Sequence, residues 1–158
     1  METKGIEMKK QILVALLSLA AGCSYAGTEE KRVTSISNEA YTIDGSFGQL
    51  ILTKDCSFSA FGSLSHIDKS QMTITFQTNN KTCQIVGFYK ENSFSSSPFF
   101  DRVDHWKSSS DFYVLEGGRI VRTSGCWGNS GDVFVGSDGI AFSGSRTLCS
   151  IREIYEPN

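Results

Sequence analysis

Short runs of alternating apolar and polar residues, separated by turn residues, make up nearly all of the chain after residue 40. The clearest run is Met72–Gln77, in which apolar residues alternate with Thr and Gln. A period of two places the apolar side chains on one face of a β-strand. Tyr41–Ile43 and Phe47–Thr53 form a second example, joined by the turn dipeptide Asp44-Gly45. The pattern predicts a mainly β protein, a small antiparallel β-barrel or β-sandwich of about 8–9 short strands.

One segment departs from this pattern. Ser97 and Pro98 suit the first turn of a helix, with a capping hydroxyl followed by proline at the first helical position. Phe99, Val103 and Trp106 then follow at i, i+4 and i+7 and would share one helix face. We predict one short helix over about residues 98–108.

The C-terminal third contains a faint repeat. Asp111–Val114 precedes the turn Gly117-Gly118, and Asp132–Val135 precedes the turn Asp138-Gly139. Each copy reads as a hairpin followed by a cysteine. Either the two hairpins are repeats, or they are alike only because all short hairpins are.

The chain begins with a pattern typical of an export signal. Met8-Lys9-Lys10 is followed by the apolar run Gln11–Ala21, which is short for a membrane span. We expect a signal peptide at residues 1–26 with the true start at Met8, because Ser24-Tyr25-Ala26 fits a signal peptidase site. The expected location is the periplasm or the outside of the cell. Residues 27–40 would then be an N-terminal linker, and residues 41–158 a single β domain.

A second cleavage site competes with the first. Leu19–Cys23 resembles the lipobox of bacterial lipoproteins, which implies that Cys23 would be lipidated and would anchor the protein to the outer membrane. This lipid would be the expected link to a membrane. Both cleavage sites remain open.

Four further cysteines have the arrangement of a disulfide framework rather than a metal site. An even number of cysteines in an exported chain allows three pairings, of which we favour sequence neighbours. Each bridge would contribute about 3 kcal/mol. The spacing between them is too long for a zinc site, so we expect neither a metal nor another cofactor. The favoured pairs are Cys56 with Cys83 and Cys126 with Cys149.

The stretch Cys126–Asp132 resembles the nucleophile loop of trypsin-like serine proteases. The resemblance implies Ser130 as nucleophile and the Gly128 amide as oxyanion donor. It departs from the family at Asn129 and Asp132, and the chain before it is too short for the second protease barrel. We therefore expect no enzyme. The remaining members of a triad would be His66 as base and Asp104 or Asp111 as the orienting carboxylate.

Asp101 and His105 lie four residues apart and would share a helix face. Two ligands do not make a metal site, so we interpret them as part of a solvated surface.

The segment 91–110 is long for a connection in a chain of tight turns, and such insertions often bind partners. Aromatic rings among serines offer much contact area at little entropic cost. Alternatively, these rings are core and close one end of a barrel. The candidate binding residues are Phe94, Phe99, Phe100 and Trp106.

The formal net charge of −2 makes nucleic acid a poor partner, since phosphate binding needs clustered positive charge. We expect an exported bacterial binding or inhibitory protein whose partner is another protein. A periplasmic immunity protein or a lysozyme-inhibitor-like protein is the most concrete form, by analogy with other compact disulfide-linked domains. The alternatives are an adhesin or toxin-binding subunit and, last, the protease.

Overall fold

The computed structural model describes residues 27–46, 48–92, 97–104, 108–127 and 131–158. In these ranges the chain is mainly β, with 58% of residues in strands and no helix. The strands are β1 (Thr28–Ser35), β2 (Ala40–Ile43), β3 (Gln49–Lys54), β4 (Ser63–Asp68), β5 (Thr73–Phe76), β6 (Lys81–Asn92), β7 (Phe99–Arg102), β8 (Phe112–Val114), β9 (Ile120–Thr123), β10 (Asp132–Val135), β11 (Ile140–Phe142), β12 (Leu148–Cys149) and β13 (Ile151–Pro157).

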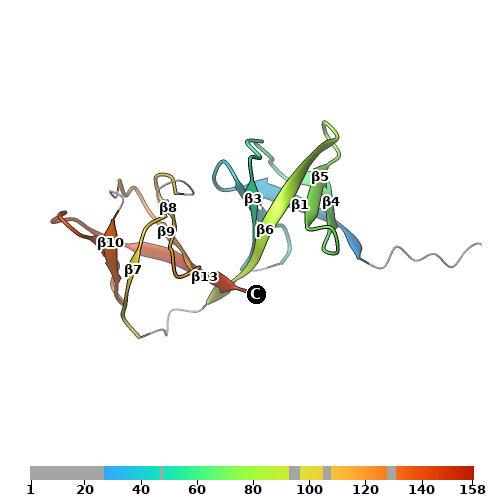
Figure 1. The fold of residues 1–158 in the computed structure, drawn as a ribbon. Helices are drawn as coiled ribbons and strands as arrows, with labels where there is room; N and C mark the ends of the chain where they lie inside the picture. The colour runs from blue at the N-terminus through green and yellow to red at the C-terminus, as the bar shows by residue number, and fades with distance from the viewer. Residues whose placement is uncertain (1–26, 47, 93–96, 105–107, 128–130) are drawn as a thin grey trace, which may run out of the picture.

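The first six strands form a closed antiparallel barrel, here called the first lobe (residues 27–92). Neighbours pair in the order β3-β2-β1-β4-β5-β6, and a further pairing of β3 with β6 closes the ring. Alternate residues of each strand point inward, so Val33, Ile51, Ile74 and Phe76 are fully buried. The barrel lies at one end of the molecule (Figure 1).

The remaining strands form the second lobe (residues 97–158), which repeats this order. β9 pairs with β8, and β7, β10, β11 and β12 pair in sequence. An isolated bridge between Val103 and Leu115 joins the end of β7 to β8. Only Ser150 separates β12 from β13, and β13 pairs back onto β9. The sequence β1 to β6 therefore corresponds to β7, β8, β9, β10, β11 and the combined β12–β13.

The register of the pairs agrees between the lobes. Ile74 lies opposite Cys83 in the first lobe, and Ile140 lies opposite Cys149 in the second. β6 and β13 each have one register shift, at the same place along their pairing with β3 and β9. The lobes are therefore two copies of one structural unit.

Equivalent side chains make the same contacts in both copies. The Tyr41 hydroxyl donates to the Cys56 carbonyl at 2.9 Å, and the Tyr113 hydroxyl donates to the Cys126 carbonyl at 3.0 Å. The residues identical at equivalent positions include Arg32 and Arg102, Val33 and Val103, Tyr41 and Tyr113, Thr53 and Thr123, Cys56 and Cys126, Ile74 and Ile140, Phe76 and Phe142, Cys83 and Cys149, Ile85 and Ile151, and Tyr89 and Tyr155.

The two lobes join through these equivalent last strands. β6 and β13 pair in antiparallel fashion, with Lys90 opposite Glu156 at the centre. On one side Tyr155 lies opposite Glu91, and on the other Tyr89 lies opposite Pro157. Exchanging the lobes maps one pair onto the other, so the junction has a local pseudo-twofold axis. An apolar cluster from both lobes covers it, formed by Ala40, Leu50, Leu52, Phe112, Val114, Ile120 and Tyr155.

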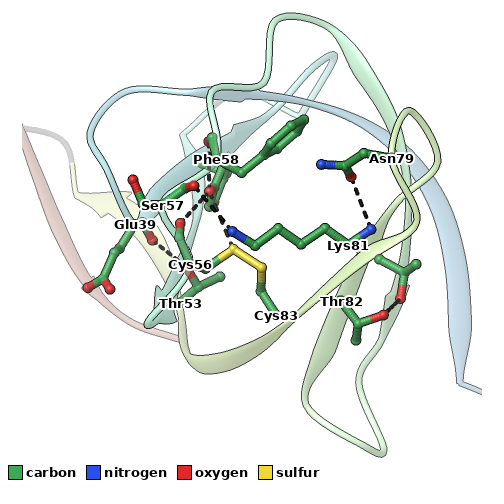
Figure 2. The surroundings of a disulfide bond; sticks show 11 residues. Glu39, Thr53, Cys56, Ser57, Phe58, Asn79, Lys81, Thr82 and Cys83 are labelled. Atoms are coloured by element: carbon green, nitrogen blue, oxygen red, sulfur yellow. Dashed lines mark hydrogen bonds between the residues drawn. A yellow bond between two sulfur atoms is a disulfide. The ribbon is translucent and has the colours of Figure 1, made fainter.

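Both predicted disulfides are present. Cys56 pairs with Cys83 in the first lobe, and Cys126 pairs with Cys149 in the second. Figure 2 shows the surroundings of the first bridge, where the Lys81 ammonium reaches across it and donates to the Ser57 carbonyl at 3.2 Å. Each bridge fastens the loop after the third strand of its lobe to the last strand.

Several details of the sequence prediction are wrong. The predicted helix at 98–108 is absent from the described part of that segment, where Phe99–Arg102 forms β7. The predicted linker at 27–40 contains β1, which pairs with both β2 and β4. The described residues contain thirteen strands rather than the expected 8–9. The hairpins at Asp111–Val114 and Asp132–Val135 hold different places in the lobe, so the true repeat is the whole lobe.

Asp111 fixes the loop that carries the second bridge, and its removal should weaken the fold in a pH-dependent way. Its Oδ1 accepts hydrogen bonds from the Cys126 amide at 2.6 Å and the Thr123 hydroxyl at 2.9 Å. The Cys126 amide is the main cause that lowers the pKa of Asp111, with the Thr123 hydroxyl assisting. A lowered pKa stabilises the folded state above the unfolded value, and this stabilisation is lost as pH falls through the folded value.

We expect Asp111→Asn to lower the urea midpoint at pH 7, and the difference from wild type to shrink as pH falls below about 4. Urea titrations at several pH values measure this difference in midpoint, and Asp138→Asn in a surface turn is the control. A deficit that stays constant down to pH 2 would contradict this role.

Candidate binding surface

Four apolar side chains lie in a line across the outward face of the second lobe. Phe100 on β7 is directly opposite Phe134 on β10, which is opposite Ala141 on β11, and Ala141 is opposite Leu148 on β12. These four residues are called the apolar row. Cross-strand partners on one face stand side by side, so the row is one continuous surface.

The three large side chains of the row are exposed to solvent, and Ala141 between them is half-buried. Phe100 is 82% exposed, Leu148 is 59% exposed and Phe134 is 37% exposed. The rings of Phe100 and Phe134 contact one another, with centroids 4.9 Å apart and planes tilted by 51°. They line a shallow depression of about 400 Å³. Single exposed apolar residues are common, but contiguous exposed apolar patches typically mark interaction sites.

The first lobe has a polar row at the same positions. Glu30, His66, Thr75 and Thr82 are consecutive cross-strand partners on β1, β4, β5 and β6. They contact each other through polar groups: Glu30 Oε2 lies 3.8 Å from His66 Nδ1, and the Thr75 and Thr82 hydroxyls lie 2.8 Å apart. The same backbone thus folds with polar residues at all four positions, and the fold does not require the apolar row.

A charged pair borders the row on one side, and a glycine without a side chain borders it on the other. Arg102 Nε donates to Asp132 Oδ1 at 2.8 Å, two residues along from Phe100 and Phe134, and both side chains are exposed. On the opposite side, a Cβ on Gly136 would approach the Phe134 ring to 3.2 Å. The missing side chain leaves room for the ring to lie low over the strand end. The row is thus a shallow apolar strip beside an exposed charge pair.

Phe100 is the predicted binding residue that the structure places in this surface. Phe99 is the next residue, so it points to the opposite side and packs on the core of the second lobe, with the Arg119 guanidinium 4.2 Å from its ring centroid. Phe94 and Trp106 lie outside the described residues. The sequence reasoning missed Phe134 and Leu148. A signal for Phe134 was available, since Val133-Phe134-Val135 lacks the alternation of a strand with one solvated face.

The residues of the protease hypothesis are not assembled in the described parts of the chain. His66 lies on β4, where its Nε2 is 2.8 Å from the Gln77 amide nitrogen, and Figure 1 shows β4 and β10 at opposite ends of the molecule. Asp111 binds the Cys126 amide. Ser130, Gly128 and His105 lie outside the described residues, and Asp104 lies just after β7.

The Asp101 carboxylate accepts a hydrogen bond from the Gly117 amide at 3.1 Å. Within the described ranges, no three His, Cys, Asp or Glu side chains gather in an arrangement that could hold a metal ion. A helix with the length and apolarity needed to span a membrane is likewise not found among the described residues.

Comparisons with known proteins give no match: no family model, no curated protein and no solved structure is similar to this chain. The only comparison we can make for the apolar row is therefore with the equivalent polar row of the first lobe.

Proposed function

We propose that this chain is an exported binding protein that acts by contact with another protein through the apolar row. One observation carries the proposal. Four equivalent positions are polar in the first lobe and apolar in the second, where the three large side chains are exposed. Exposed apolar area costs free energy in water, about 25 cal/mol per Å², which a partner recovers on binding.

The row favours a protein partner over a sugar or nucleic acid. Phe100, Phe134 and Leu148 offer rings and methyl groups but no hydrogen-bonding groups, whereas a sugar needs partners for its hydroxyls. The flanking Arg102–Asp132 pair suits the polar rim of a protein interface. We therefore propose a folded partner with an apolar patch bordered by charged residues.

An inhibitory role, as for an immunity protein or an inhibitor of a wall-degrading enzyme, fits the way the row is held. Its strands belong to a lobe closed by the Cys126–Cys149 bridge. A surface fixed in this way loses little conformational freedom on binding, which favours tight complexes.

Replacing the row by its counterpart from the first lobe should abolish partner binding while preserving the fold. The variant carries Phe100→Glu, Phe134→His, Ala141→Thr and Leu148→Thr, a set of residues that the same backbone already accommodates in the first lobe. We expect the free energy of binding to the partner to weaken by at least ~2 kcal/mol, as for hot-spot residues at an interface centre. Capture from a cell-envelope extract, quantified by mass spectrometry, identifies the protein that wild type retains and the variant loses.

The matched control is Phe61→Ser, which removes an exposed aromatic ring of the first lobe, 93% exposed, and should retain the partner. Sedimentation of both proteins measures self-association. A partner captured equally by wild type and the row variant would refute the proposal. The proposal would also be refuted if the wild-type protein captured only further copies of itself.

A further inference from the structure

We propose that the first lobe contains a site for a small zwitterion with an apolar side chain, such as a free apolar amino acid. This site is separate from the apolar row and does not depend on the function proposed for it. The observation behind it is a cavity of about 250 Å³ at the mouth of the first barrel. Its apolar part is lined by Ile43, Leu50, Ile67 and Phe88, and its polar part by Glu29, Gln49, Lys69 and Tyr89. Asn158, which follows β13 of the second lobe, also lines it.

In the second lobe the equivalent place is filled. Glu29 lies opposite Ile67, and its counterpart Phe99 lies opposite Val135 at the same register. The Phe99 ring packs on the second core, and the Arg119 guanidinium lies 4.2 Å from its centroid. Arg119 is the counterpart of Gln49, since each precedes the residue that pairs with the tyrosine of the last strand. The same fold therefore has a filled barrel opening in the second lobe and an open one in the first lobe.

The open mouth has an exposed, charged residue, Glu29, on the strand face that points inward further along β1. Glu29 shares the face of Val33, where a barrel normally places apolar side chains. Glu29 Oε1 lies 2.7 Å from the Lys69 ammonium, and Glu29 Oε2 lies 4.0 Å from that of Lys31. The hydrogen bond from Lys69 is the main cause that lowers the pKa of Glu29, so the carboxylate is ionised at neutral pH. Of these groups, Glu29 and Lys69 line the cavity itself, so its mouth presents a carboxylate and an ammonium group side by side.

This charge pair determines the class of ligand. A zwitterion places its ammonium near Glu29 and its carboxylate near Lys69, so each charge keeps an opposite partner. A simple carboxylate would bring a second negative charge beside Glu29, and a simple amine would do the same beside Lys69 with a positive charge. An apolar side chain then enters between Ile43, Ile67 and Phe88.

The size of the cavity agrees with this class. An engineered apolar cavity of about 150 Å³ accepts benzene, whereas drug-sized ligands need about 300–1,000 Å³. The first-lobe cavity holds one ring or one branched aliphatic group with its polar head at the mouth. It is too small for a peptide or a lipid chain.

Titration of the purified full chain with L-phenylalanine tests the proposal. We expect saturable shifts in the NMR methyl signals of Ile43 and Ile67, with 3-phenylpropionate and 2-phenylethylamine binding at least ~10-fold more weakly because each lacks one charge. The variant Glu29→Phe, Gln49→Arg copies the closed mouth of the second lobe and should not bind. Lys69→Ala, at an exposed position, should fold normally and lose at least ~10-fold in affinity for L-phenylalanine.

Glu30→Gln is the control, because Glu30 is adjacent to Glu29 and belongs to the outward polar row. It should bind like wild type. Absence of saturable shifts in the wild-type protein would overturn the proposal. Binding that survives in both the closed-mouth variant and Lys69→Ala would overturn it too, and equal affinity for 3-phenylpropionate would overturn the zwitterion assignment.

Discussion

Replacing Phe76 by alanine should lower the free energy of unfolding by about 3–5 kcal/mol, the range for a buried aromatic side chain. Phe76 is fully buried in the first lobe, and its ring centroid lies 5.1 Å from that of Tyr41 and 4.6 Å from that of Phe58. The loss combines the transfer of the ring out of the core with the cavity that it leaves. Urea unfolding followed by circular dichroism measures the effect.

The second lobe provides an internal comparison. Phe142 is the counterpart of Phe76 and contacts Tyr113 with centroids 4.9 Å apart, so Phe142→Ala should cost a similar amount. The control is Phe61→Ala, whose ring is 93% exposed and should change stability by less than about 0.5 kcal/mol. Equal stability of Phe76→Ala and wild type would contradict the assigned core.

Loss of the Cys126–Cys149 bridge by a double change to serine should cost about 2–5 kcal/mol. The bridge joins residues 23 positions apart and anchors the loop after β9 to β12. Without it, the unfolded chain gains conformational entropy and the short strand β12 loses its attachment. The double variant Cys56→Ser, Cys83→Ser should lose a similar amount in the first lobe.

Denaturant titrations with and without reductant measure both bridges. Reduced wild type should be less stable than either double variant, since it lacks both links. Trp127→Ser serves as the control, because Trp127 follows Cys126 directly and is 87% exposed. A double variant with the wild-type midpoint would show that the bridge does not stabilise this lobe.

The mainly β fold, as either a barrel or a sandwich, and the two disulfides could be predicted from the sequence. Alternation in Met72–Gln77 indicates a strand whatever its neighbours are, and β5 occupies Thr73–Phe76. The pairing of neighbouring cysteines needed only loops of moderate length and the expectation that an export signal leads to an oxidising compartment.

The helix prediction failed because its main evidence fits a strand equally well. Phe99 and Val103 are four positions apart, an even spacing that puts them on one side of a strand as well as on one side of a helix. Both face the core of the second lobe, but through β7 and its continuation. The pairing of β7 with β10 outweighed the capping signal of Ser97 and Pro98, because proline is also tolerated at the beginning of a strand.

The repeat was missed because its identical residues are scattered. Ile43 and Leu50 are seven positions apart, whereas their counterparts Leu115 and Ile120 are five apart, which shifts the two copies relative to each other. Similarly, Phe100 could be proposed as an isolated aromatic in a polar loop, but its contact with Phe134 follows from strand register. Register over such distances is a property of the folded barrel and has no local sequence signal.

The symmetric β6–β13 junction has an evolutionary consequence. Two identical subunits joined by such a seam would share one sequence, so every substitution would appear twice, on both sides of the axis. Such subunits would also separate on dilution, whereas halves on one chain keep a fixed effective concentration. In a single chain, each half can change its surface residues or its barrel opening without the same change in the other half. The β6–β13 pairing between the halves is kept. One half has thus become free to expose phenylalanines, and the other to open a charged entrance.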